Sequence, residues 1–149
     1  MKPIRTWILV ADASRSKVYE HRGPGHGLEA VAGLAMATEH RKSSEIGSDK
    51  PGRSFESVGA VRHAVEPHSD PARIEEQRFA ASLLERLNQE AAAKRFDRLV
   101  LVAPPTMLGD LRAALPSGIA PLVMATIDKD LTKIPDHKLA GHLSDILPV

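Results

Sequence analysis

The feature that most constrains the fold is an uninterrupted apolar string, Leu-Val-Leu-Val-Ala, at residues 99–103. A second string of this kind, Trp-Ile-Leu-Val, stands at residues 7–10. Both are rich in residues that favour strands, and neither alternates with polar side chains. Because an exposed sheet face would require such alternation, these strings are typical of strands buried on both faces. They predict strands over Ile4–Ala11 and Arg98–Ala103.

The first third of the chain predicts an antiparallel meander. Residues 16–21 alternate polar and apolar side chains, as expected for a strand. The string Gly-Pro-Gly-His-Gly at 23–27 is a strong turn signal, and it predicts a hairpin that returns along Leu28–Met36. Three antiparallel strands are therefore expected to open the fold.

A long helix is predicted to begin at Asp70-Pro71. Aspartate is a favoured N-cap residue, and proline is favoured at the first helical position. The helix can continue to about Lys94. Its expected buried face carries five apolar residues at helical spacing, namely Ile74, Phe79, Leu83, Leu84 and Leu87.

The remaining elements complete an α/β fold. Thr106 is expected to cap a short helix that runs to Leu115, Leu122–Ile127 to form the last strand, and Pro135–Leu147 to form a closing helix. The prediction is a mixed five-stranded sheet, with three antiparallel strands followed by helix, strand, helix, strand and helix. This order is that of a ribonuclease-H-like fold. At 149 residues, one domain spanning 1–149 is expected.

Residues 37–71 are predicted to form a long loop, because apolar periodicity disappears over this interval. Loops longer than about 15 residues are uncommon inside compact domains and often carry function. The loop is therefore the first place to look for activity.

Composition excludes several classes of protein. The formal net charge of +1 argues against a duplex-DNA binder, which would need a broadly basic surface. The absence of cysteine removes disulfides, thiolate metal ligands and a cysteine nucleophile, and it is compatible with a reducing compartment. No apolar run near the start resembles a membrane span or a signal peptide. A cytoplasmic protein without a membrane partner is expected.

Asp12, which follows the first predicted strand, is a candidate for a nuclease site. Ribonuclease-H-like nucleases cluster carboxylates around divalent ions at that position. Here the neighbouring strand ends in Val-Ala-Pro-Pro at 102–105, without a second carboxylate. Asp12 is therefore interpreted as a turn residue that accepts backbone hydrogen bonds. Asp128 and Asp130 follow the last strand, and a solvated turn explains them as well.

The histidines and serines match no standard catalytic or metal-binding pattern. Three loop histidines stand at spacings without a ligand motif, namely His40, His63 and His68, and His137 and His142 are five apart rather than four. No serine hydrolase pattern surrounds Ser14, Ser54 or Ser57. The sequence therefore predicts no metal and no cofactor, and it favours a binding protein over an enzyme.

The loop contains the most distinctive string, Ser-Asp-Lys-Pro-Gly-Arg-Ser-Phe, at residues 48–55. Lys50 and Arg53 flank Pro51-Gly52, so a turn there can present two cations and bare backbone amides, which suits a phosphate or an anionic partner. Three further cations lie in the same loop, Arg41, Lys42 and Arg62. The candidate ligand-binding or RNA-binding residues are these five cations and Gly52. A solvated loop is the competing interpretation.

A possible anion site lies where the strand over 98–103 meets the next helix. Thr106 and Gly109 belong to this helix, whose amino-terminal amides and dipole favour negative charge. A structural interpretation competes equally: the two prolines end the strand and start the helix, and Gly109 permits close packing.

At these strings the sequence resembles the bacterial "protein required for attachment to host cells" family. The matching segments are spread over nearly the whole chain, at residues 7–15, 49–55, 78–80, 96–105, 108–112 and 128–132. The family is in turn similar to the middle domain of archaeal and eukaryotic peptide-release factors. That domain carries a long loop with a Gly-Gly-Gln tripeptide into the ribosomal peptidyl-transferase centre. This chain has Pro51-Gly52-Arg53 instead, and no Gly-Gly-Gln.

The resemblance implies a translation-linked RNA contact. The first hypothesis is a cytoplasmic, metal-free binding protein that contacts RNA or the ribosome through the basic loop. The alternative is a protein-interaction component of an attachment pathway that never touches RNA. A release-factor-like hydrolase is a third and weaker hypothesis, since the Gly-Gly-Gln tripeptide is missing.

Overall fold

The computed structural model describes residues 3–38 and 70–147. In these ranges the elements follow in order, β1 (Thr6–Ala11), β2 (Arg15–His21), β3 (Glu29–Ala30), β4 (Met36–Ala37), α2 (Pro71–Ala92), β5 (Arg98–Ala103), α3 (Pro105–Ala114), a 3₁₀ turn η3 (Ala120–Leu122), β6 (Val123–Asp128) and α4 (Asp136–Leu143). The protein is therefore a mixed α/β fold, as predicted. The predicted loop over residues 37–71 falls almost entirely outside these ranges.

The sheet has the strand order β3-β2-β1-β5-β6, and β4 also pairs with β2. β1 is antiparallel to β2 and parallel to β5, and β5 is parallel to β6. The prediction of five strands was wrong, because the six described strands include a return segment split into two short pieces. β3 and β4 each pair with two residues of β2, and the chain between them turns at Gly33, where φ is +83°.

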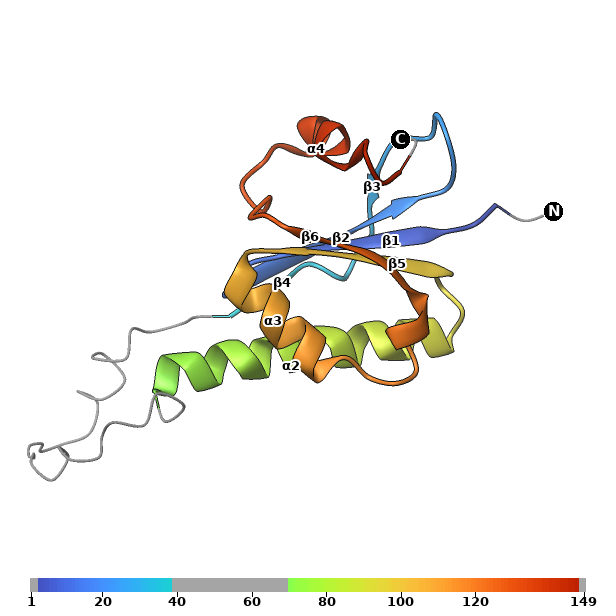
Figure 1. The fold of residues 1–149 in the computed structure, drawn as a ribbon. Coiled ribbons are helices and arrows are strands. Elements are labelled where there is room, and N and C mark those ends of the chain that lie inside the picture. The colour runs from blue at the N-terminus through green and yellow to red at the C-terminus, as the bar shows by residue number, and fades with distance from the viewer. Residues whose placement is uncertain (1–2, 39–69, 148–149) are drawn as a thin grey trace, which may run out of the picture.

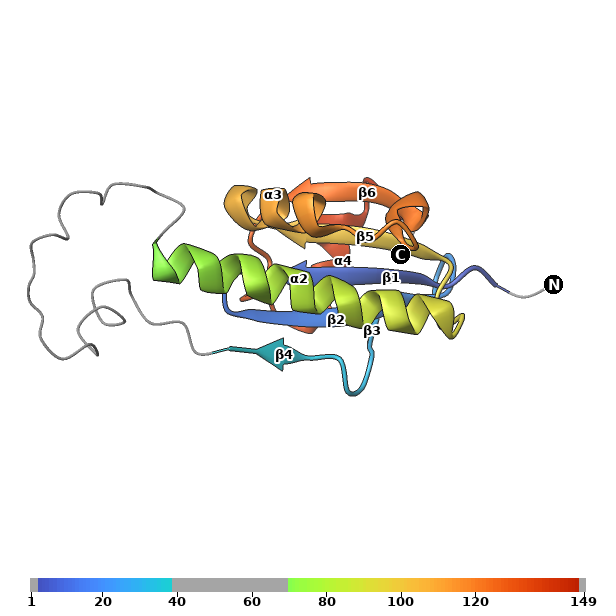
Figure 2. The same cartoon turned by 90° about the horizontal axis from the view of Figure 1, so that it is seen from below.

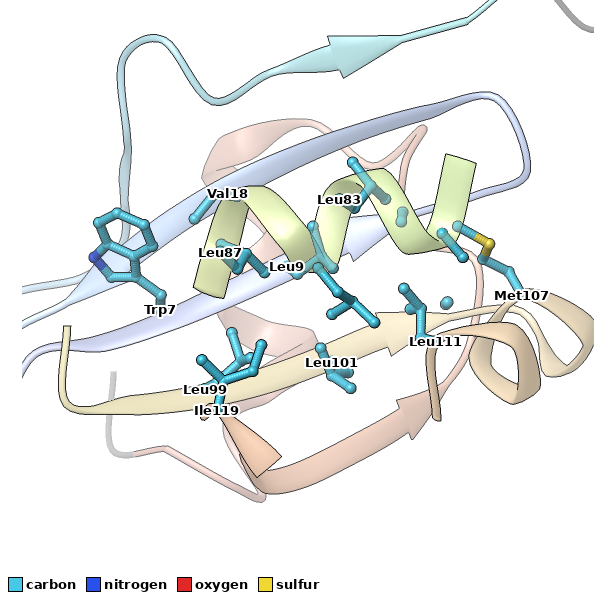
Figure 3. Close-up of a cluster of buried hydrophobic side chains, with 14 of the residues drawn as sticks. Trp7, Leu9, Val18, Leu83, Leu87, Leu99, Leu101, Met107, Leu111 and Ile119 are labelled. Atoms are coloured by element: carbon cyan, nitrogen blue, oxygen red, sulfur yellow. The ribbon is translucent and has the colours of Figure 1, made fainter. Parts of the chain in front are cut away.

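The sheet is covered on both faces, as the two apolar strings predict. Figure 1 shows α2 and α3 below the sheet and α4 above it. Seen from below, α2 runs across β1 and β2 while α3 lies along β5 and β6 (Figure 2). Alternate residues of β1 point to the two cores: Leu9 packs with Leu83, Leu87 and Leu101 beneath the sheet (Figure 3), and Ile8 belongs to the core under α4.

The predicted start of α2 is confirmed. Asp70 is the N-cap, and its carboxylate accepts a hydrogen bond of 3.0 Å from the backbone amide of Ala72. Four of the five predicted core residues are buried, whereas Ile74 in the first turn is only half-buried. The helix ends at Ala92, two residues before the predicted Lys94, because Lys94 has a φ of 60° that no α-helix accommodates.

The helix boundaries after β5 required corrections. Thr106 does not cap α3, because Pro104 holds the N-cap position and Pro105 the first helical position. The closing helix covers only Asp136–Leu143 of the predicted Pro135–Leu147, and the chain continues in turns to Leu147, which is buried against the core under α4.

Among the helices of the described ranges, none combines the length and the apolar character that crossing a bilayer would require.

Candidate functional site

The carboxyl ends of three parallel strands meet at one edge of the sheet, which we call the carboxyl edge. β1, β5 and β6 end there, on the left in Figure 1, and α2 and α3 both begin there. The residues that follow the three strands are Asp12, Pro104 and Lys129. Ligands of α/β proteins commonly bind at such an edge, because loops and helix N-termini converge on it.

Asp12 is held in a turn at this edge. Its Oδ1 accepts hydrogen bonds from the backbone amides of Ser14 at 2.8 Å and Arg15 at 2.9 Å. Partial burial alone would raise the pKa of the Asp12 carboxyl, but these amides, with the Thr132 hydroxyl and the Arg15 side chain, outweigh it and hold the pKa below its ordinary value. The interpretation of Asp12 as a turn residue that accepts backbone hydrogen bonds is confirmed.

Thr132 ties the loop after β6 to the loop after β1. Its hydroxyl lies 3.1 Å from Asp12 Oδ2 and 2.6 Å from Asp130 Oδ1. A hydroxyl has one proton to donate, so it can serve only one of the two carboxylates at a time. Asp128, the last residue of β6, is exposed. In the part of the chain that the structure describes, no group of three or more acidic, histidine or cysteine side chains is arranged to hold a metal ion.

The described residues on either side of segment 39–69, Thr38 and Asp70, both lie at this edge. The backbone amide of Thr38 donates a 2.8 Å hydrogen bond to the carbonyl of Ser14, in the Asp12 turn. Asp70, at the other end, caps α2, whose first turn lies at the same edge (Figure 1). The six candidate loop residues, Arg41, Lys42, Lys50, Gly52, Arg53 and Arg62, lie outside the described residues. The structure thus places the two residues that flank the segment but not its basic side chains.

Two cavities border β4, close to Thr38. One of about 250 Å³ is lined by Arg15, Lys17 and Thr132. The other, of about 420 Å³, is lined by Thr38, Glu75 and Arg78, and one Glu75 carboxylate oxygen is buried without a hydrogen-bond partner.

Sequence reasoning did not single out these lining side chains. Alternation along β2 could have indicated that Arg15 and Lys17 share a face, and Arg78 stands in one of the strings that carry the family resemblance. The positive charge is partly offset, since Arg15 lies 3.5 Å from Asp12 and Lys17 lies 4.0 Å from Asp136.

The amino end of α3 also lies at the carboxyl edge, with Thr106 in its first turn and Gly109 one turn further on. Both are exposed. Pro104 and Pro105 have no amide proton, so only Thr106 and Met107 can offer an N–H before the first intrahelical hydrogen bond, from Leu108 to Pro104. A side chain at position 109 would meet no atom within 4 Å, so the interpretation that Gly109 permits close packing was wrong.

The string at 108–112, which belongs to the family resemblance, connects several elements of the fold. The Asp110 carboxylate accepts two hydrogen bonds from the Arg73 guanidinium, at 2.8 and 2.9 Å. Arg112 donates to the hydroxyl of Thr126 in β6, at 2.9 Å. The string therefore connects α3 to α2 on one side and to the sheet on the other.

Comparison with known proteins identifies the family. Residues 7–143, from β1 to the end of α4, match the family described as "Protein required for attachment to host cells". The chain belongs to this host-attachment family. It is also 31% identical, over 97 residues, to an uncharacterized protein of Rickettsia prowazekii (strain Madrid E). That match covers 64% of this chain and 58% of the relative.

Proposed function

We propose that this host-attachment family protein binds RNA, on the ribosome, through the basic segment 41–62. The observation that carries the proposal is the position at the carboxyl edge of the two residues that flank the segment, Thr38 on the Asp12 turn and Asp70 on α2. A segment whose two flanking residues are fixed on a rigid sheet edge loses less conformational entropy on binding than a free tail does. The edge therefore serves as a platform for the segment.

The charge of the segment supports an anionic partner. Lysine and arginine outnumber aspartate and glutamate by five to three over residues 41–63. The platform adds the exposed side chains of Arg15, Lys17 and Arg78, although acidic groups offset the first two. The described residues of the carboxyl edge carry charges of both signs. The cations that select an anionic partner in this proposal are therefore those of the segment, above all Lys50 and Arg53.

The fold relationship is part of the same proposal. The meander of β1 to β4 followed by helix, strand, helix, strand and helix is compatible with a ribonuclease-H-like sheet and with the middle domain of peptide-release factors. We propose the release-factor relationship because the long segment enters at the comparable place in the strand order. Peptidyl-tRNA hydrolysis is not proposed, since no Gly-Gly-Gln is present. A cytoplasmic location belongs to the proposal, as ribosome binding requires it.

Co-sedimentation of the purified protein with ribosomes, at low and at moderate salt, tests the proposal. The variant Lys50→Ala/Arg53→Ala is expected to reduce the bound fraction at both salt concentrations. A matched control, Arg86→Ala/Lys94→Ala, removes the same charge near and just beyond the carboxyl end of α2 and should bind as the wild type does. Binding of all three proteins to the same extent would contradict the role of Lys50 and Arg53. Binding of none would favour the alternative of a partner protein in the attachment pathway.

A further inference from the structure

The opposite edge of the sheet, where the parallel strands begin, holds a cavity of about 360 Å³ that the proposed RNA contact does not use. Its walls include Ile4, Thr6, His21, Arg22, Arg98 and Leu147. This volume is at the lower end of the range for small-molecule sites. We call this cavity the amino-edge cavity.

Strand register aligns three polar side chains along one wall of the amino-edge cavity. Thr6 of β1 is paired with His21 of β2 on one side and with Arg98 of β5 on the other. Side chains at paired positions stand on the same face of a sheet. An imidazole, a hydroxyl and a guanidinium therefore form a row across three adjacent strands, on the face that α4 covers further along.

His21 is the most unusual member of this row. Its exposed fraction is only 3%, and its Nε2 is buried without a hydrogen-bond partner. A buried polar group without a partner is destabilising, and such groups in native proteins usually mark a bound water, ion or ligand. A half-turn of the ring about the Cβ–Cγ bond exchanges nitrogen and carbon positions, so a ring nitrogen can be directed toward the cavity.

The charged and apolar residues that line the amino-edge cavity indicate which class of ligand it can bind. Arg98 is exposed and forms no ion pair with the described residues, whereas Arg22 is occupied by Glu20. Ile4, with an exposed fraction of 48%, and the buried Leu147 supply apolar surface beside these donors. A guanidinium, a hydroxyl and an imidazole next to an apolar wall suit an anionic head group on a short hydrocarbon body.

We propose that the amino-edge cavity binds a small organic anion, with its carboxylate or phosphate group at His21 and Arg98 and its apolar part against Ile4. The site lies at the opposite edge of the sheet from the proposed RNA platform. A bound anion supplies the hydrogen-bond partner that the His21 ring lacks among the described residues.

The test uses three probes of equal chain length, hexanoate, hexyl phosphate and hexanol, titrated into the full-length protein and followed by ¹H–¹⁵N NMR and calorimetry. We expect one or both anions to shift the signals of Thr6, His21 and Arg98, and hexanol to bind at least tenfold more weakly. The two anions distinguish a carboxylate site from a phosphate site. Equal binding of hexanol, no saturable binding of either anion, or shifts confined to the carboxyl edge would overturn the proposal.

A variant separates the site from general charge effects. Because Arg98 is exposed, Arg98→Ala should fold, and losing a charge-assisted hydrogen bond should weaken anion binding roughly tenfold or more. Arg86→Ala, which removes an equal charge from the exposed face of α2, should leave anion binding unchanged. Equal affinity in the wild type and Arg98→Ala would count against the site, whatever the ribosome experiment shows.

Discussion

Arg73 of α2 and Asp110 of α3 form a bidentate ion pair, in which Nη1 and Nη2 of Arg73 donate to the two carboxylate oxygens of Asp110 at 2.9 and 2.8 Å. Glu76 accepts a further bond of 2.7 Å from the same guanidinium. The hydrogen bonds that Arg73 donates, to Asp110 first and then to Glu76, raise the pKa of Arg73, so the guanidinium is charged throughout the accessible pH range. The pair connects α2 to α3 through two residues that are 37 positions apart in the sequence.

Breaking this pair is expected to loosen α3 from α2. Asp110→Ala and Arg73→Ala should each lower the free energy of unfolding by about 1–2 kcal/mol, because a partly buried, two-pronged pair is worth more than an exposed one. The double variant should cost clearly less than the sum of the two. Urea unfolding, followed by the emission of the single tryptophan, measures all three. Arg86→Ala, which breaks the more exposed pair with Glu90, should cost less than 1 kcal/mol, and full additivity of the Arg73 and Asp110 effects would show that the pair is not coupled.

The Asp12 turn predicts a pH dependence of stability. Since the pKa of Asp12 is lowered in the folded protein, its ionised form stabilises the fold above the ordinary value of 3.8, and this contribution is lost as the pH falls through the lower, folded value. Asp12→Asn should therefore be less stable than the wild type at pH 7, and the difference should shrink below about pH 4. Unfolding free energies at both pH values measure this. Asp145→Asn, at an exposed position, should follow the wild type, and a constant gap for Asp12→Asn would argue against the mechanism.

Gly109 offers a substitution that should stabilise the protein. It lies inside α3, is exposed, and has space for a methyl group. Alanine favours a helix over glycine by up to about 1 kcal/mol, so Gly109→Ala should raise the melting temperature by a few degrees. Gly118→Ala is the opposite case, because its methyl carbon would come within 2.7 Å of Asn88 Oδ1. A lower melting temperature for Gly109→Ala would mean that the glycine serves a bound partner or a backbone need not evident in α3.

Salt dependence gives the RNA proposal a quantitative check. If Lys50 and Arg53 each contact one phosphate of a single strand, the slope of log affinity against log salt should become shallower by about 1.4 in Lys50→Ala/Arg53→Ala, at roughly 0.7 per contact. Fluorescence anisotropy with a labelled single-stranded RNA, between low and moderate salt, measures the slope. An unchanged slope with weaker binding would indicate that the two residues shape the segment without touching phosphate.

Much of the central sheet could be predicted from the sequence, because its determinants are local. The apolar strings at 7–10 and 99–103 could only be strands covered on both faces, and Asp70-Pro71 carries its own start signal for α2. The split of the return strand was missed, since two-residue strands leave almost no pattern. Thr106 was assigned as a cap because threonine suits that role, but the prolines before it begin the helix two residues earlier.

The contacts that bring distant residues of the fold together could not be predicted from local sequence patterns. The partner of Asp110 lies 37 positions away, and the hydroxyl that reaches Asp12 lies 120 positions away. No spacing rule connects residues at such separations. The sequence indicates His21 only as the end of a strand, and the register of β2, β1 and β5 is needed to place it in one row with Thr6 and Arg98.

The pairing of β1 with both β2 and β5 has a consequence for the growing chain. β2 follows β1 at once, but the connection at the start of β5, from the Arg5 amide to Asp97, spans 92 residues. At about 5–20 residues per second, synthesis leaves the second edge of β1 without its partner for roughly 5–20 seconds. During that interval the string Trp-Ile-Leu-Val is an open, apolar strand edge, which is prone to pair with other chains. We therefore expect the nascent protein to be more prone to aggregation than the finished one.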